Sequence, residues 1–600
     1  MADKTKAPKW DLESIFPGGS KSKEFKKFRQ EIQNNLEASN KTLESLSSLE
    51  GEIDYKRWGK LVLDMQKLGD DIKQAYSFAG CLISQDVEDT EGHRIDAELS
   101  AYSARWQSIM TGLESFALKL SDDEWNNFII VAGLEEIRFF LDEMREMAKS
   151  KMPPVLEKLA ISLAVDGYHA WNRLYDKMAG DLRVDFTENG KTKRISLGQL
   201  APKMDSPDND IRRTAFEKLT EVWESQAELA AMTLNSMAGF RLALYKNRKW
   251  DSPLYEPLKN ARLKRETLET MWSVVSNAVP GFKKYINTKK KLLGIDKFMW
   301  YDQTAPVGKS SRTYTYDEAG DFIVEHLSSF SPEIGNFSRM AIDKKWIEAE
   351  DRPGKAAGGF CTGFPISKES RIFMTFTGTY GCLSTLAHEL GHAYHGWVLK
   401  DKPPFISLYP MTLAETASTF NELRVTDVAL KTASDPQEKL MLLDQKLQNA
   451  YIYFCNIHAR FLFDVSFYEE RKNGMVSRNR LEELMVEAQE KAYAGTIDSY
   501  YPLFWASKLH FFFTGVPFYN FPYTFGYLFA MGIYDRALKE GPTFAKSYRA
   551  LLADTGNMNT EDVAKKHLGV DLTKEDYWKD AVKRAMADIE PFVKLAEKIG

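Results

Sequence analysis

The chain has 600 residues, of which 44% are apolar and 28% are charged, with 80 basic and 85 acidic residues and a formal net charge of −5. This length is enough to bury a large core, and the nearly balanced charge, with no basic run longer than Lys289–Lys291, argues against nucleic acid as a partner. No linker rich in Pro, Gly or Ser divides the chain, so we expect few, closely packed domains.

The cysteines and the first residues predict a cytoplasmic protein. Residues 1–6 contain no apolar stretch and no small-residue cleavage site, so we expect no secretory signal. The cysteines show neither paired nor metal-binding spacing, and we interpret them as small buried apolar residues: Cys81, Cys361, Cys382 and Cys455. Both features favour a reducing compartment.

The N-terminal third of the chain is predicted to be almost entirely helical. Trp10–Pro17 is a short apolar segment that would tether the N-terminus to the body, and apolar residues then recur every three or four positions within the first 180 residues. Two alternating runs within residues 182–197 flank Asn189-Gly190, which predicts a β-hairpin. We expect an N-terminal helical lobe at residues 1–200 and a second lobe at 201–600.

The second lobe is also mostly helical, with one predicted strand. Helical periodicity covers residues 208–247 and 264–293, begins again at Asp317, and extends over most of the chain after Leu413. Arg371–Thr377 alternates with period two and is rich in β-branched and aromatic residues, so it predicts a strand. Gly378–Gly381 predicts a turn into the next helix.

That next helix carries the most informative motif, His388-Glu389-x-x-His392. Residues four apart lie on one face of a helix, so the two imidazoles can bind one Zn²⁺ while Glu389 faces the open coordination position. The alternative is an amphipathic helix whose histidines have this spacing by chance. The upstream strand favours the zinc site, because a strand beside such a helix can hold an extended substrate. The 201–600 lobe is therefore expected to be catalytic.

A third protein ligand is expected downstream of the motif. The candidates are four acidic residues: Asp401, Glu415, Glu422 and Asp427. Glu415 is favoured because it lies early in the next helical pattern, and Glu422, seven residues on and on the same side, could orient a ligand histidine. Thr412 to Glu415 also fits a capping box, in which Glu415 would only accept a backbone hydrogen bond. His395 is expected to pack or support the site, since a fourth protein ligand would close the metal to water.

The aromatic segment His510–Tyr534 is interpreted as a cavity wall. Pro517, Asn520 and Pro522 interrupt it, which argues against a membrane span and against a membrane partner. Its polar aromatic residues form a candidate donor set for a developing oxyanion: His510, Tyr519, Tyr523 and Tyr527. Aromatic residues at helical spacing are also typical of a core.

Along nearly its whole length the chain resembles the oligoendopeptidase F family, which is related to thimet oligopeptidase. The resemblance is carried by Trp10-Asp-Leu12, Trp300-Tyr-Asp302, Gly354 to Phe360, the strand Phe373 to Phe376, His388-Glu-Leu-Gly-His392, Glu415-Thr-Ala-Ser418 and His510 to Tyr527. It implies a largely helical, cleft-shaped zinc peptidase that cleaves oligopeptides internally and excludes folded proteins. It also implies that Glu415 is the third zinc ligand.

We therefore expect an all-α fold with a small β element lining a deep active-site cleft, built from two helical lobes. The expected activity is zinc-dependent endopeptidase cleavage of short, unstructured peptides. His388, His392 and Glu415 would bind Zn²⁺, and Glu389 would take a proton from the attacking water and pass it to the leaving amine.

In the same mechanism, His510 and one of Tyr519 or Tyr523 would stabilise the oxyanion, and the substrate backbone would pair with Ile372–Thr377. One alternative is a zinc carboxypeptidase, which needs a cation such as Arg371 to bind the terminal carboxylate. Another is a catalytically silent helical peptide-binding protein, against which the intact Glu389 argues. The sequence makes no prediction about oligomeric state.

Overall fold

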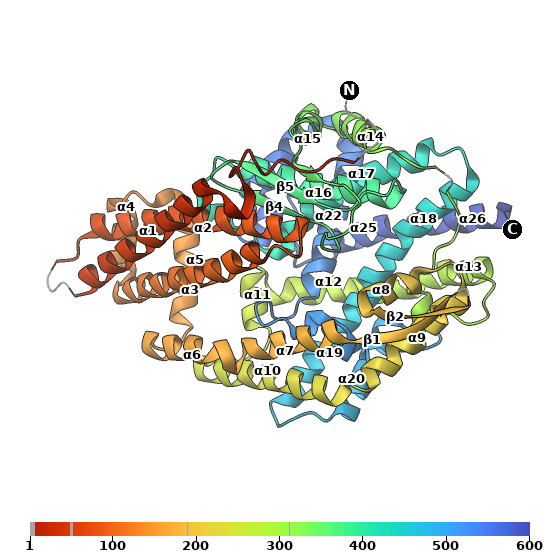
Figure 1. Ribbon diagram of the computed structural model, residues 1–600, viewed down its shortest axis with the longest axis horizontal. Coiled ribbons are helices and arrows are strands. Elements are labelled where there is room, and N and C mark those ends of the chain that lie inside the picture. The colour runs from red at the N-terminus through yellow and green to blue at the C-terminus, as the bar shows by residue number, and fades with distance from the viewer. Residues whose placement is uncertain (1–6, 49–51, 189, 311, 600) are drawn as a thin grey trace. The chain divides into compact units, whose positions relative to one another are not determined.

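The structure is a computed structural model that describes residues 7–48, 52–188, 190–310 and 312–599 (Figure 1). In this part of the chain the fold is mainly helical with only small sheets, which confirms the predicted all-α class. Two compact units alternate along the chain. The first comprises the described residues up to Lys158, Arg312–Val428 and Arg536–Leu568, and the second comprises the remaining segments. The predicted boundary after residue 200 falls inside the second unit and stays a prediction.

The helices of the first unit include α16 (Tyr380–Leu399), which carries the motif His388-Glu389-x-x-His392. They are α1 (Lys23–Ser47), α2 (Tyr55–Gln85), α3 (Thr90–Lys119), α4 (Asp122–Val131), α5 (Arg138–Lys149), α14 (Tyr316–Ser328), α15 (Pro332–Asp343), α16 (Tyr380–Leu399), α23 (Ala545–Asp554) and α24 (Thr560–Leu568). Three further helices run from one unit into the other: α6 (Pro154–Gly167), α17 (Met411–Thr432) and α22 (Phe521–Glu540).

The second unit contains the hairpin and the remaining helices. Its helices are α7 (His169–Asp181), α8 (Leu197–Leu200), α9 (Asn209–Glu224), α10 (Ala227–Arg248), α11 (Tyr255–Asn260), α12 (Arg265–Ala278), α13 (Lys283–Leu293), α18 (Pro436–Tyr451), α19 (Ile457–Arg471), α20 (Arg478–Tyr493), α21 (Phe504–Ser507), α25 (Glu575–Ala585) and α26 (Ile589–Ile599). The helical periodicity predicted for these segments is confirmed.

Three long helices, α1, α2 and α3, pack side by side in the first unit (Figure 1). Each helix is preceded by a residue whose side chain accepts a hydrogen bond from a backbone N–H of the first turn; these residues are Ser22, Asp54 and Asp89 respectively. Their apolar faces form one core, in which the rings of Trp58 and Phe116 stack with centroids 3.8 Å apart. The sequence periodicity thus becomes a continuous buried stripe.

A three-stranded sheet in the first unit lies against α16 (Figure 1). Its order is β3 (Ile347–Glu348), β5 (Glu369–Phe373) and β4 (Phe360–Phe364), with β5 parallel to β3 and antiparallel to β4. The N-terminal segment is tethered here as predicted, because Trp10 is buried with its ring 5.6 Å from that of Phe373 and its Nε1–H donates to Gln85 Oε1 at 2.8 Å.

The predicted pairing of a substrate with Ile372–Thr377 is wrong. β5 is the central strand, so Ile372 and Phe373 already have a neighbouring strand on each side. Beyond it, Met374 N–H and Phe376 N–H donate to the carbonyls of Glu348 and Ala349, both at 2.9 Å. The period-two pattern of Arg371–Thr377 predicts a strand, but it carries no information about which other strands pair with it. Among the described strands of this sheet, β3 and β4 are the two edge strands, and β4 is the longer of them.

The hairpin in the second unit is confirmed. β1 (Arg183–Glu188) and β2 (Lys191–Ser196) pair antiparallel, with Glu188 opposite Lys191, while Asn189 lies outside the described residues. The inward side chains of Val184 and Phe186 pack with α8 and α9 in a small core. Gly190 has φ +72°, a conformation that glycine adopts without strain.

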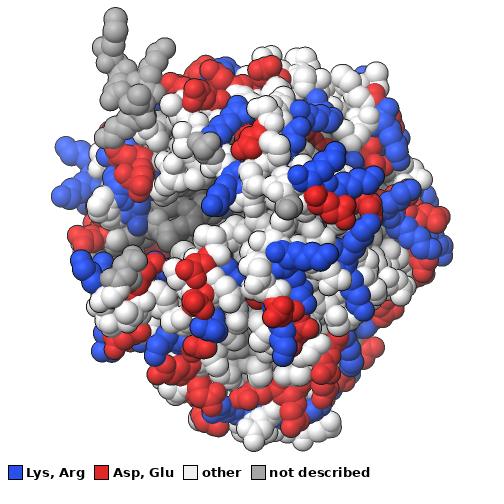
Figure 2. Space-filling model, turned by 90° about the vertical axis from the view of Figure 1, so that its right-hand side faces the viewer, with Lys and Arg blue, Asp and Glu red and all other residues white. Residues whose placement is uncertain are grey.

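The face of the molecule seen in Figure 2 carries both signs of charge. On the face seen in Figure 2, Lys and Arg are interspersed with Asp and Glu, as expected for a chain with 80 basic and 85 acidic residues. Over the described residues, no helix is both long and apolar enough to cross a membrane. The four cysteines are free thiols.

Candidate metal centre

Two helices of the chain, α16 and the N-terminal part of α17, bring the predicted site residues together. α16 begins after Thr379, whose side chain accepts a hydrogen bond from Cys382 N–H. Gly391 lets the two helices approach closely, because a Cβ at this position would lie 2.4 Å from Ala417 O and 2.5 Å from Ser418 Cα. A side chain there would push α17 away from α16.

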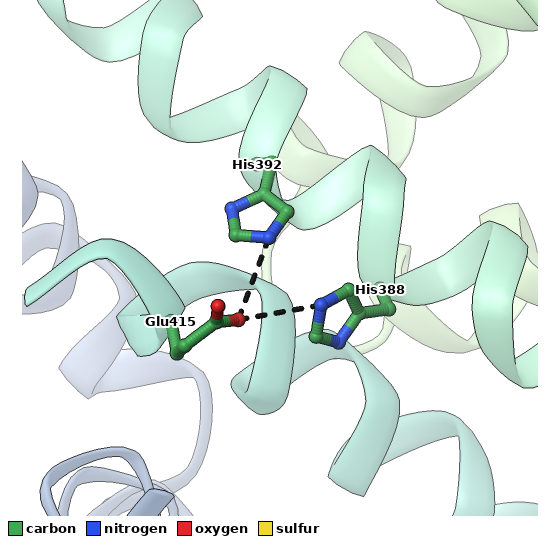
Figure 3. A group of neighbouring side chains, drawn as sticks. All are labelled: His388, His392 and Glu415. Atoms are coloured by element: carbon green, nitrogen blue, oxygen red, sulfur yellow. Dashed lines mark ion pairs between the residues drawn. The ribbon is translucent and has the colours of Figure 1, made fainter. Parts of the chain in front are cut away.

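The side chains of His388, His392 and Glu415 converge across this contact (Figure 3). Glu415 Oε2 lies 3.3 Å from His388 Nε2 and 3.4 Å from His392 Nε2. One donor atom from each of the three residues lies within 4.8 Å of the other two. The side chains are 26%, 21% and 23% exposed respectively, so the group is recessed but accessible.

This arrangement fits a divalent metal ion. Tetrahedral ligands about 2.0–2.1 Å from Zn²⁺ lie about 3.3 Å from one another, which matches the distances from Glu415 to the two imidazoles. Burial alone would raise the pKa of Glu415, but its bonds to His388 and His392 outweigh burial and hold that pKa well below the usual range. Glu415 is therefore ionised at neutral pH, as a metal ligand must be.

The other nitrogen of His388 has its own partner. His388 Nδ1 lies 3.2 Å from Glu422 Oε2, so the carboxylate can accept a hydrogen bond from Nδ1–H, which leaves the Nε2 lone pair facing the group. Ser418 Oγ donates to Glu415 Oε2 at 2.7 Å and restrains that carboxylate as well. Glu422 thus lies where a residue orienting a ligand histidine is expected.

Glu389 lies beside this group in a different environment. It is only 7% exposed, and its Oε2 has no hydrogen-bond partner among the described residues. Burial raises the pKa of its carboxyl, an effect that the nearby His388 and His392 partly oppose. Gly359, just before β4, is close by, because a Cβ there would lie 3.9 Å from Glu389 Oε1. The buried carboxylate therefore lies near the start of the edge strand.

The remaining acidic candidates do not join the group. Asp401 is exposed and pairs with Lys368 Nζ at 2.7 Å, and Asp427 lies outside the cluster that could hold a metal ion. The carboxylate of Glu415 faces the imidazoles, which favours the ligand over the capping box. His395 is fully buried against Tyr409, with ring centroids 4.1 Å apart, in the packing role expected for it.

His510, Tyr519 and Tyr523 lie together in the second unit. The His510 ring is 5.0 Å from that of Tyr519 and 6.0 Å from that of Tyr523, and the two tyrosines stack with centroids 5.2 Å apart. The Nδ1 atom of His510 is buried without a hydrogen-bond partner among the described residues. Tyr527 is buried and stacks on Tyr453, with ring centroids 4.4 Å apart.

The cation suggested for a carboxypeptidase has a structural role. Arg371 is fully buried, and its guanidinium donates to Asp11 O at 2.9 Å, to Ser14 Oγ at 3.0 Å and to Glu369 Oε2 at 2.9 Å. It ties the N-terminal segment to β5 and is not free to bind a carboxylate. A cavity of about 790 Å³ in the same unit, between α2 and β4, offers room beside the edge strand.

Sequence reasoning missed two cations beside His510. Arg460 and Lys508 line a cavity with His510 and Tyr523. Lys508 could have been associated with His510 from the sequence, because the two residues are only two positions apart in one short segment. Arg460 lies far away in sequence within an amphipathic helix, and nothing in its surroundings there distinguishes it from a surface arginine.

Comparisons with known proteins agree with this fold. Residues 203–584 match the family model described as Peptidase family M3, and residues 118–183 match the model described as Oligopeptidase F. The chain is 23% identical over 604 residues to oligopeptidase PepF of Bacillus subtilis (strain 168), covering 98% of this chain and 87% of that protein. It is 25% identical over 605 residues to the chromosomal oligoendopeptidase F of Lactococcus lactis subsp. cremoris, covering 98% and 97%. The crystal structure of oligoendopeptidase-F from Enterococcus faecium is similar in fold, with a TM-score of 0.72 at 21% identity, covering 96% of this chain and 99% of that one.

Proposed function

Because the chain belongs to peptidase family M3, we propose that it is a zinc-dependent endopeptidase that hydrolyses internal bonds of short, unstructured peptides. The observation that carries this proposal is the convergence of His388, His392 and Glu415 beside the buried carboxylate of Glu389, whose Oε2 has no hydrogen-bond partner among the described residues. Two imidazoles and one carboxylate are the protein ligands typical of catalytic zinc in peptidases, which leave one coordination position open.

In this proposal His388, His392 and Glu415 hold Zn²⁺, which when bound would polarise the scissile carbonyl and lower the pKa of water. Glu422 orients His388 through its Nδ1 proton. Glu389 supplies the proton transfers: its free oxygen accepts a proton from the attacking water and then passes it to the nitrogen of the leaving amine. The recessed position of the group limits the access of other water molecules.

His510 and one of Tyr519 or Tyr523 are proposed to donate hydrogen bonds to the carbonyl oxygen as negative charge develops on it. Support comes from their mutual contact and from the family resemblance of this segment. Burial, together with the nearby Lys508 and Arg460, lowers the pKa of His510 to about 3, so the ring is neutral at pH 7. A neutral imidazole still has one N–H to donate.

The peptide backbone is proposed to run along β4 in place of the predicted alignment on Ile372–Thr377. β4 is an edge strand of the described sheet, and Gly359 at its start is close to Glu389. Pairing of main chains fixes the register of an extended peptide with little dependence on its side chains. Unpaired cysteines further support the proposed cytoplasmic location.

The test combines metal analysis with mass spectrometry of a digested peptide mixture. We expect close to one Zn²⁺ per chain, cleavage at internal bonds, and loss of both on treatment with a chelator. Release of C-terminal residues alone would favour the carboxypeptidase. A zinc-loaded chain that binds peptides and cuts none would be the silent peptide-binding protein.

A further inference from the structure

A cavity of about 210 Å³ lies inside the second unit, beside His510. Its wall includes Arg460 on α19 and Tyr523 on α22. It also includes Lys508, which directly precedes the short 3-10 helix η8 (Leu509–Phe512). A π-helical turn, η7 (Ile452–Asn456), joins α18 to α19 and contributes its first two residues to the wall. Such turns are frequent at functional sites.

The cavity brings two basic side chains, Arg460 and Lys508, into one wall. Arg460 is 5% exposed; its Nε–H donates to Asn456 Oδ1 at 3.1 Å, but its Nη1 has no partner among the described residues. In the part of the chain that the structure describes, neither Asp nor Glu lines the cavity. A buried cation without a partner is costly, so an anion that enters the cavity would be stabilised there.

The acidic residue four positions after Arg460 on α19, Asp464, carries little negative charge to offset the positive charge of Arg460. Asp464 accepts a hydrogen bond from Asn520 Nδ2 at 2.7 Å, and burial raises its pKa to about 8, so it is mostly protonated at pH 7. Burial and the nearby Arg460 lower the pKa of Lys508 to about 8, so Lys508 is still mostly charged. An anion between Arg460 and Lys508 would relieve their repulsion.

We propose that this cavity binds a carboxylate of the peptide substrate through the Arg460 guanidinium and the Lys508 ammonium. The inference rests on the proposed function, in which His510 and Tyr523 of the same wall contact the carbonyl of the bond being cleaved. A guanidinium can hold two carboxylate oxygens in one plane, and the tyrosine and isoleucine walls suit a short aliphatic stem. The carboxylate is either the peptide's C-terminus or an Asp or Glu side chain.

The binding test uses the full-length, zinc-loaded Glu389→Gln variant, which holds peptides without cutting them. One arm compares a fluorescent hexapeptide as a free acid with the same peptide as its C-terminal amide. The other arm compares Glu with Gln at each internal position of the amidated peptide. We expect at least about tenfold tighter binding of the carboxylate form in one arm, which identifies its source. Equal affinities throughout both arms would overturn the proposal.

Variants then locate the effect. In Lys508→Met and Arg460→Gln, the preference should fall below about twofold, while the matched control Lys472→Met, which removes an exposed partner of Glu469, should keep it. Lys508 is only half-buried, so its variant remains informative if the Arg460 variant fails to fold. A preference that survives Lys508→Met overturns the proposal. If the unsubstituted enzyme cuts peptides internally but the carboxylate and amide forms bind equally well, this inference alone is refuted. If the carboxylate forms bind more tightly but the unsubstituted enzyme cuts no peptide, the proposed function is refuted.

Discussion

At the scale of single residues, two carboxylates beside the same histidines have opposite environments. Glu415 bonds to both imidazoles, which holds its pKa well below the usual range. Glu389 is buried, its Oε2 has no hydrogen-bond partner in the part of the chain that the structure describes, and burial raises its pKa. Paired acidic groups whose environments separate their pKa values typically divide into a charged partner and a proton carrier. This difference supports the proposal that Glu415 is a metal ligand and Glu389 the base.

The first prediction concerns the proton carrier. Glu389→Gln keeps the size of the side chain but cannot accept a proton, so kcat should fall by about 10²–10⁴-fold or more while zinc per chain stays at the parental level. The matched control is Glu333→Gln, the same change in an exposed ion pair with Arg549, and it should be neutral. Near-parental turnover of the Glu389 variant at full zinc occupancy would contradict the assignment.

The second prediction separates the ligand from the residue that orients it. Glu415→Ala removes a donor atom and should strip the metal, whereas Glu422→Ala removes only the partner of His388 Nδ1 and should weaken zinc affinity by about 10–100-fold. Zinc per chain is measured after dialysis against a graded series of chelator concentrations. A Glu415 variant that keeps full zinc and loses only about 1 kcal/mol of unfolding free energy would support the capping-box interpretation of Glu415 instead.

At the scale of elements, the distance between α16 and α17 depends on one glycine. Gly391→Ala would place a methyl group 2.4 Å from Ala417 O, and backbone cannot move aside as a flexible side chain can. The helices must separate, which should cost about 1–3 kcal/mol and carry Glu415 away from the imidazoles. We expect lower zinc affinity and a lower urea midpoint.

Gly396→Ala is the control for that change, since it adds the same methyl group to the same helix with its nearest neighbour, Ser370 Oγ, at 3.7 Å. This variant should be as stable as the parent or gain up to about 1 kcal/mol from helix propensity. If both glycine variants bind zinc and unfold alike, the close approach of the helices does not position Glu415.

Features that depend on neighbouring residues could be predicted from the sequence, whereas contacts between distant segments could not. Helices and the Asn189-Gly190 hairpin could be predicted, because periodicity and turn chemistry are local properties. His388 and His392 could be predicted because a helix fixes their geometry. The neighbours of Ile372 on β5 could not, since pairing joins segments that are distant in sequence. For the same reason, Arg460 was not associated with His510, although both line one cavity.

At the scale of the whole molecule, the two units are built from alternating segments of one chain. The candidate metal centre belongs to the first unit, and the His510 cluster belongs to the second. Neither set of residues is contiguous in sequence with the edge strand β4. Activity should therefore depend on the intact chain, and the assays that follow use it in full length.

The last prediction concerns which substrates the intact chain accepts. A backbone that pairs with β4 must be extended, and it must bring its carbonyl to side chains that are only 21–26% exposed. A folded protein would have to unfold first, which costs about 5–15 kcal/mol, whereas a short disordered peptide carries no such cost. We expect internal cleavage of peptides of about 5–20 residues, falling rates for longer unfolded chains, and little effect on native proteins. The measurement is kcat/KM over a length series of one disordered sequence, with native and denatured forms of one protein as controls. Efficient cleavage of the denatured full-length protein would contradict selection by length, whereas cleavage of the native form would contradict the requirement for an extended backbone.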